Sequence, residues 1–171
     1  MRTTNPAKAK SMEVTDKVIF PDATEQNTAL SESCSQMYIT TPAPVTIVTA
    51  GTYYKMAGTT AAYQLVNFTH SNGRLTYTGA KTRKFDVVIP FSVSSSEKDI
   101  TVTFEVYKNG GEGAVVPSRI TRTLRAVGDI YVMPLASIVE LAQGDYVELW
   151  GTASKSGTIL TIETLSFLIC S

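Results

Sequence analysis

Charge is scarce in this 171-residue sequence, and neither sign is in excess. Charged residues make up 18% of the chain, and 15 basic side chains are balanced by 15 acidic ones. A nucleic-acid-binding protein needs surplus Lys and Arg to displace counterions from phosphates, and an anionic membrane surface attracts the same surplus. The balance therefore argues against nucleic acid and membrane as partners. The low share of charged residues also predicts a surface rich in Thr, Ser and Asn, which is common in β-rich assembly proteins.

Residue types that carry out chemistry are also rare. His70 is the only histidine, and a lone histidine in a polar turn is usually a surface residue. No spacing of His, Cys or carboxylates predicts a zinc site, no glycine-rich loop predicts a phosphate site, and no carboxylate pair stands out. Asp129, Asp145 and Glu148 offer oxygens for calcium, but such Gly-Asp turns are more often only turns. We expect no catalytic residue, no metal and no cofactor, and hence a protein that is not an enzyme.

The two cysteines, Cys34 and Cys170, are separated by almost the whole chain. No feature of the sequence brings them together, so the prediction is two free, inert thiols, with a disulfide as the alternative. The polar start, Met1–Thr4, does not resemble a secretory signal, and no apolar run reaches the ~20 residues that span a bilayer. We therefore expect synthesis and folding in a cytoplasm.

The chain divides at about residue 43. Residues 1–43 have no sustained hydrophobic period and scatter charges among Thr, Ser, Asn and Pro, a composition that cannot fold alone. Val18, Ile19 and Phe20 form one short apolar island, which favours an extended N-terminal arm that binds a partner over a disordered tail. Residues 44–171 are rich in Thr, Val, Tyr, Ile and Phe and form the second predicted domain.

Alternating hydrophobic residues dominate the second domain. In residues 85–93, every odd position is Phe, Val or Ile, and residues 100–106 repeat the pattern at even positions. Such alternation buries one face of each strand. Asn72-Gly73 between two extended segments predicts a tight hairpin. No segment has a helical stripe, so many short strands predict an all-β sandwich or barrel.

Several segments, in the right order, resemble the globular heads of the complement first component and the tumour necrosis factor superfamily. Residues 74–79, followed by Phe85, resemble the aromatic, turn glycine and Phe-led strand of those heads. Residues 102–110 resemble the next strand and its Asn-Gly turn. Residues 137–149 resemble an apolar strand, a Gly-Asp turn and an alternating strand, and residues 165–169 resemble the closing strand.

Together with residues 52–55 and 67–70, these segments look most like the trimeric jelly-roll proteins of tailed phages. The resemblance implies an antiparallel jelly-roll β-sandwich and a homotrimer. It also implies a capsid decoration, cement or head-fibre protein that binds the major capsid protein on the virion surface, after synthesis in the host bacterial cytoplasm. The alternative is the receptor-binding tip of a tail fibre or baseplate that recognises a host surface glycan.

The same resemblance implies where the subunits meet. If Val147 and Leu149 point into the sandwich, then Tyr146, Glu148 and Trp150 point outward. Outward aromatics usually need a partner surface, and in this kind of trimer they often line the axis. These three residues are therefore the predicted subunit interface, with a tryptophan covered by a loop as the alternative. Val18, Ile19 and Phe20 are the predicted capsid-docking residues of the arm.

Overall fold

The computed structural model describes residues 18–19, 25–26, 33–110 and 116–171. The chain forms two units, Met1–Ser31 and Glu32–Ser171. In the first unit, β1 (Val18–Ile19) pairs antiparallel with β2 (Glu25–Gln26). Two of the three predicted capsid-docking residues therefore lie in β1, and Phe20 lies outside the described residues.

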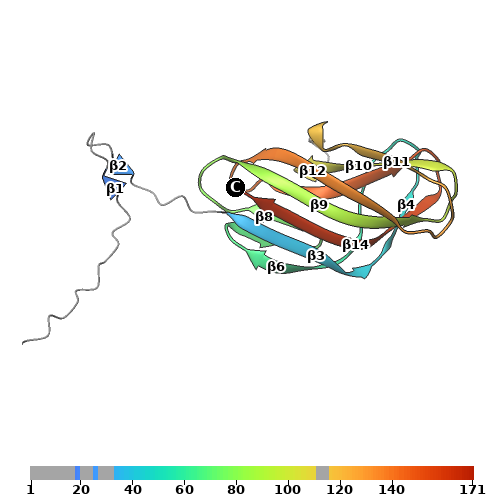
Figure 1. Cartoon of the computed structure of the whole chain (residues 1–171), viewed down its shortest axis with the longest axis horizontal. Coiled ribbons are helices and arrows are strands. Elements are labelled where there is room, and N and C mark those ends of the chain that lie inside the picture. Colours follow the sequence, from blue (N-terminus) through green and yellow to red (C-terminus); the bar gives the residue numbers. More distant parts are fainter. Residues whose placement is uncertain (1–17, 20–24, 27–32, 111–115) are drawn as a thin grey trace, which may run out of the picture. The chain divides into compact units, whose positions relative to one another are not determined.

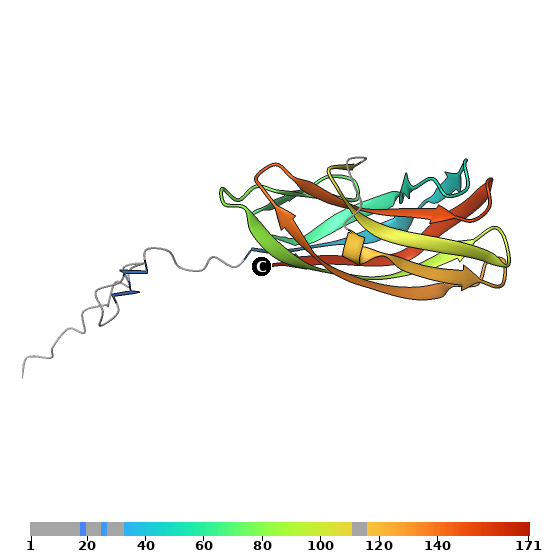
Figure 2. The ribbon, with the colours of Figure 1, turned by 90° about the horizontal axis from the view of Figure 1, so that it is seen from above.

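The second unit is a sandwich of two six-stranded antiparallel sheets, which Figures 1 and 2 show from two directions. Sheet I faces the viewer in Figure 1. Its strands follow the order β12 (Tyr131–Leu141), β9 (Arg83–Ser95), β14 (Thr158–Cys170), β3 (Cys34–Pro42) and β6 (Gly58–Leu65). The sixth strand, β4 (Pro44–Ile47), also pairs with β14. The strands of sheet II follow the order β11 (Ile120–Leu124), β10 (Ile100–Lys108), β13 (Tyr146–Ala153), β8 (Arg74–Tyr77) and β7 (Phe68–His70). Its sixth strand, β5 (Tyr54–Lys55), also pairs with β13.

This architecture confirms the predicted all-β, antiparallel jelly-roll sandwich. Within the described residues there is no α-helix, and the one helical segment is a short 3-10 turn, η2 (Val116–Ser118). Accordingly, no helix in that part of the chain is long and apolar enough to cross a bilayer.

The core is built from the alternating residues that the sequence predicted. The odd residues of β9 from Phe85 to Val93 are at most 2% exposed, and so are the even residues of β10 from Ile100 to Val106. The rings of Phe91 and Phe104 meet edge to face between the two sheets, with centroids 4.9 Å apart. A Cβ on Gly151 would lie 2.6 Å from the Phe104 ring, so only glycine fits beside this aromatic contact.

The predicted Asn-Gly hairpin joins β7 to β8. Asn72 and Gly73 have φ angles of 43° and 73°, and the backbones of Ser71 and Arg74 exchange two 3.1 Å hydrogen bonds. Two successive residues in the left-handed region match the right-handed twist of hairpin strands, which explains the preference for Asn-Gly here.

The predicted domain boundary at residues 43 and 44 is too late in the chain. Strand β3 (Cys34–Pro42) lies inside sheet I, where it pairs with β14 on one side and β6 on the other. Ser35 and Met37 are at most 1% exposed. This strand was not predicted from the sequence, because its inward positions include a serine and its outward positions are mostly polar, so hydrophobic residues do not alternate clearly along it.

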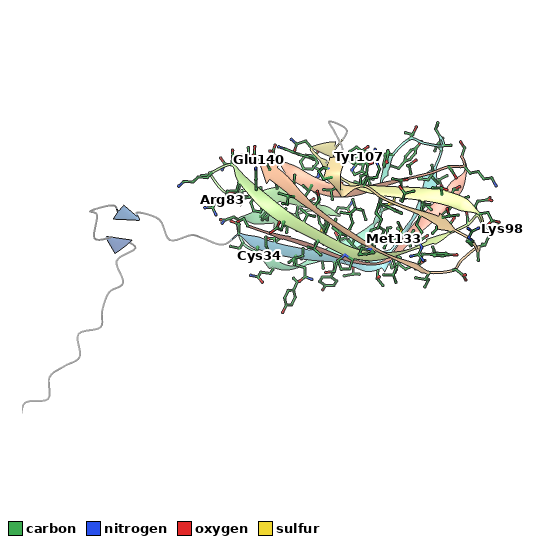
Figure 3. All side chains as sticks on the ribbon, turned by 45° about the horizontal axis from the view of Figure 1, so that its top comes forward. Cys34, Arg83, Lys98, Tyr107, Met133 and Glu140 are labelled. Atoms are coloured by element: carbon green, nitrogen blue, oxygen red, sulfur yellow. A yellow bond between two sulfur atoms is a disulfide. The ribbon has the colours of Figure 1, made fainter. Side chains whose placement is uncertain are left out.

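The prediction of two free thiols is also wrong. Cys34 at the start of β3 is the register partner of Cys170 at the end of β14, with Cα atoms 4.1 Å apart, and the two form a disulfide. Figure 3 labels Cys34 at one end of the sandwich. The bond closes a loop between residues 136 positions apart, so it connects the first and last strands of the sandwich.

Candidate functional site on the outer face of sheet II

The outer face of sheet II carries a group of acidic, basic and aromatic side chains, which we call the acid–aromatic cluster. Its centre is formed by outward positions of the neighbouring strands β10 and β13, and Figure 3 labels Tyr107 there. Side chains from β5, β8 and the segments before β5 and β11 complete it. The members are Tyr53, Lys55, Arg74, Glu105, Tyr107, Arg119, Tyr146, Glu148, Trp150 and Thr152.

Glu148 organises one half of this cluster although it is only 1% exposed. Its Oε1 accepts hydrogen bonds from Lys55 Nζ at 2.8 Å and Arg74 Nε at 2.9 Å, and its Oε2 accepts one from Trp150 Nε1 at 3.0 Å. Burial raises the pKa of Glu148, but the hydrogen bonds from Lys55, Trp150 and Arg74 outweigh it and hold that pKa below its usual value. Glu148 is therefore ionised and unsuited to donate a proton.

Glu105 organises the other half and is also 1% exposed. Its Oε1 accepts hydrogen bonds from Tyr53 Oη at 2.7 Å and from Arg119 Nε. Burial and the bond to Glu105 raise the pKa of Tyr53 to about 12. Glu105 Oε2 and Thr152 Oγ1 are buried without a hydrogen-bond partner in the described part of the chain. A buried acceptor without a donor is costly, so these two oxygens are the least satisfied part of the cluster.

Aromatic rings connect the two halves. Tyr107 and Trp150 stack with centroids 4.7 Å apart and planes inclined by 17°, and Tyr53 contacts Tyr107 at 5.6 Å. All three side chains are partly exposed. At the far side, the Arg74 guanidinium lies 3.7 Å from the centroid of the Tyr146 ring. The cluster thus offers ring surface next to fixed hydrogen-bonding groups, a combination typical of ligand sites.

The outward direction predicted for Tyr146, Glu148 and Trp150 is confirmed, because Val147 and Leu149 are 0% and 4% exposed in the core. Glu148 and Trp150 bond to each other, and Tyr146 packs against Arg74. The role of the three residues as a subunit interface stays a prediction.

Sequence reasoning missed Glu105 and Tyr107. Their parity on β10 was visible, since both alternate with the buried residues of that strand. The pairing of β10 with β13, which places Glu105 opposite Trp150, was not visible.

The other polar residues considered in the sequence have local roles. Asp145 accepts bonds from Asn109 Nδ2 and the Ala142 backbone N, both at 2.8 Å, and pairs with Lys108 at 2.7 Å, so it fixes a turn. His70 Nε2 lies 2.7 Å from Thr60 Oγ1. Across the described ranges, no group of three or more His, Cys, Asp or Glu side chains could hold a metal ion.

The outer face of sheet I differs sharply along β9 and the edge strand β12, and we call this part the uncharged face. Its outward positions on β9 from residue 88 to 94 and on β12 from residue 132 to 138 are all Val, Pro, Ser, Ala or Ile. Val88, Val132 and Ile138 are 44%, 64% and 59% exposed. An open groove of about 640 Å³ lies at one end of this face, between Val88, Ala136, Ile138 and Pro117 of η2. The carboxylate of Asp86, the register partner of Ile138, bounds the groove and the uncharged face at this end.

Comparisons with known proteins show a shared fold without sequence similarity. No family model matches the chain, and no curated protein matches it. Among solved structures, murine APRIL is 10% identical, with a TM-score of 0.57, and the match covers 82% of this chain and 99% of APRIL. The Eiger TNF from S. frugiperda is 9% identical, with a TM-score of 0.59, over 82% of this chain and 92% of Eiger.

A third similar chain comes from the structure of infectious bursal disease virus, Gx strain. It is 11% identical, with a TM-score of 0.51, and the match covers 100% of this chain and 40% of the viral one. Identities this low show the fold alone. The second unit of the chain is therefore a jelly-roll β-sandwich with a tumour-necrosis-factor-like fold.

Proposed function

We propose that this chain is a non-enzymatic structural protein of a virion. Specifically, it is a homotrimeric capsid decoration, cement or head-fibre protein that binds the major capsid protein of a bacteriophage and stabilises the shell. Stabilisation follows from mass action, because a protein that binds only the assembled shell favours the assembled state.

The observation that carries the proposal is the uncharged face of sheet I. Burying a charged side chain against a partner costs several kcal/mol unless it is paired, whereas Val, Ala, Ile and Pro gain free energy when buried. Val88, Val132 and Ile138 are all more than 40% exposed in the single chain. Contiguous exposed apolar surface marks interaction sites, so we place the subunit interface here. Tyr146, Glu148 and Trp150 are less suitable, since Glu148 is already paired with Lys55 and Arg74.

The edge of sheet I favours contact through this face over strand addition. Edge strand β12 carries Pro134 at its centre, opposite Pro90 of β9. Proline has no backbone N–H to donate to an added strand, and natural sheets use it to block edge-to-edge pairing.

Three further observations support a place on a virion surface. A chain of the infectious bursal disease virus structure shares the fold. The Cys34–Cys170 disulfide suits an oxidising setting, and virion surfaces are among the places where disulfides persist. Val18 and Ile19 precede the sandwich in a separate unit, as expected of an arm that binds the shell.

Sedimentation of the purified chain tests the trimer. At micromolar concentration, the expected species has three times the 18.5 kDa mass of the chain. A monomer throughout that range contradicts the proposal. Imaging of the parent particle then tests the location, because density at the local threefold axes of the capsid supports a decoration or cement protein. Density at the tail tip instead supports the receptor-binding alternative.

A further inference from the structure

We propose that the acid–aromatic cluster of sheet II is a saccharide-binding site, in which a sugar ring packs on the Tyr107–Trp150 pair and one of its hydroxyls donates to Glu105. This inference goes beyond the structural function proposed above and does not depend on the trimer, since it concerns the opposite sheet.

The stacked rings supply the apolar part of such a site. Tyr107 on β10 and Trp150 on β13 hold each other nearly parallel, 4.7 Å apart, and both are partly exposed. The Trp150 indole is held by its hydrogen bond to the buried Glu148, so its orientation is set before any ligand arrives. The negative face of an aromatic ring attracts the weakly positive C–H groups on the apolar side of a pyranose. A ring fixed in advance loses little side-chain entropy on binding.

The buried oxygens supply the polar part. Glu105 Oε2 and Thr152 Oγ1 are both buried and lack a partner in the described ranges. They belong to adjacent strands and the same outer face, since Glu105 is the register partner of Trp150 and Thr152 is that of Thr103. A carboxylate oxygen accepts hydrogen bonds only, whereas a hydroxyl both donates and accepts. A sugar hydroxyl that reaches them would therefore satisfy both atoms, because it can donate to Glu105 Oε2 and accept from Thr152 Oγ1.

The charge of the cluster decides between a sugar and a cationic ligand. Three cations, Lys55, Arg74 and Arg119, surround the two carboxylates, Glu105 and Glu148, which leaves one positive charge in excess. A lysine or arginine side chain from a protein partner would meet this excess charge, because both carboxylates are already ion-paired, Glu105 through its Oε1 with Arg119 and Glu148 with Lys55 and Arg74. A neutral hydroxyl-rich ligand meets no such penalty, and a sugar with one carboxylate could pair with Arg119, which is 63% exposed.

The chain contains its own reporter, because Trp150 is its only tryptophan. Fluorescence of the full chain is measured during titration with glucose, galactose, N-acetylglucosamine and rhamnose, and separately with a penta-lysine peptide. We expect a saturable change in Trp150 emission with at least one sugar and none with the peptide. No saturable response to any of the four sugars overturns the proposal, and so does a response to penta-lysine alone.

Two substitutions and one control locate the binding. Glu105→Gln replaces one acceptor oxygen of the carboxylate by an NH2 group, which cannot accept from a sugar hydroxyl. The loss of a hydrogen bond to a charged group corresponds to about a tenfold rise in the Kd of the sugar. Thr152→Val keeps the side-chain shape without the hydroxyl and should weaken binding by a smaller factor, which keeps the test decisive if Glu105→Gln does not fold. Tyr63→Ala removes an aromatic that is 77% exposed on β6 of sheet I, and it should leave the Kd unchanged. Unchanged binding in both cluster variants contradicts the assignment, as does equal weakening by Tyr63→Ala.

Discussion

The two outer faces of the sandwich are built from the same kind of strand but carry opposite chemistry. Sheet I presents Val, Ala, Ile, Pro and Ser on the outer face of β9 and of the edge strand β12. Sheet II presents two buried carboxylates, Glu105 and Glu148, together with three cations and stacked rings. Both inner faces are continuous with one core, so the difference does not come from folding requirements.

This contrast indicates two kinds of contact. A face without charges can be buried against another subunit at little desolvation cost, and the burial of its apolar side chains is favourable. A face with fixed charges and rings costs more to bury but selects its partner by hydrogen bonding and shape. We therefore assign assembly to sheet I and selective binding to sheet II, and the predictions below test this division.

The largest expected effect is the loss of the trimer when charge is placed on sheet I. In the variant Val88→Asp/Ala136→Asp, each subunit brings two unpaired carboxylates to the proposed interface, at a cost of roughly 3 kcal/mol or more. Sedimentation should show monomers at concentrations where the parent chain is trimeric, with unchanged β-rich circular dichroism. Thr123→Asp on the exposed side of β11 in sheet II is the matched control and should remain trimeric.

Trp150→Ala in the same assay distinguishes the two candidate interfaces. We expect it to remain trimeric while it loses the stacking partner of Tyr107. If it dissociates and the sheet I variant does not, the interface lies on Tyr146, Glu148 and Trp150, as the sequence resemblance implied.

The next effect concerns the disulfide on sheet I. Cys34→Ser removes the covalent link between the first and last strands, which then remain joined by backbone hydrogen bonds, packing and the Gln36–Ser166 hydrogen bond. Removal of a disulfide that closes a long loop typically costs about 2–5 kcal/mol. Denaturant unfolding should show this loss for Cys34→Ser, and the same loss for the parent chain under reducing conditions. Equal stability of the two proteins in oxidising buffer would mean that the bond does not form in solution.

The disulfide also shows what the sequence could reveal about the fold. The core of β9 and β10 and the Asn72-Gly73 hairpin were predictable, because period-2 alternation and turn preference are local properties. The pairing of β3 with β14 was not, since it joins residues at opposite ends of the chain. Strand β3 was assigned to the arm for the same reason, because its Thr and Ser residues become strand-like only beside β14 and β6.

The sequence was sufficient to predict that the site residues of β13 point outward, but not that the two glutamates are buried or which side chains they contact. The alternation of Val147 and Leu149 correctly placed Glu148 and Trp150 outward. An outward glutamate on a strand normally faces water, and nothing local shows that Glu148 and Glu105 are buried. Their burial comes from side chains on other elements, such as Lys55 on β5 and Tyr53 before it, which only the fold brings near.

A moderate effect is expected from Glu148→Gln on sheet II. The pKa of Glu148 is lower in the folded chain than its usual 4.5, so its ionised form stabilises the fold above that pH. As pH falls through the folded pKa, this contribution is lost. Because Lys55 and Arg74 are about one-third exposed, solvent screens the pairs and the variant should lose about 2 kcal/mol near neutral pH. Denaturant unfolding from pH 7 to pH 3 should show the difference between parent and variant shrinking below about pH 4. A difference independent of pH would indicate a packing defect instead of a lost charge.

The smallest effect on stability is expected from removal of residues 1–31. The sandwich begins after this unit, and both cysteines of the disulfide remain. The free energy of unfolding should therefore change by less than about 0.5 kcal/mol, and the trimer should persist, because the uncharged face is intact. Attachment to the particle should nevertheless be lost, since Val18, Ile19 and Phe20 are removed. Co-sedimentation of the truncated chain with stripped capsids measures this, with the substitution Ile19→Asp in the full chain as the matched variant. If truncation instead lowers stability by several kcal/mol, the first unit contributes to the sandwich and is not an arm for the shell.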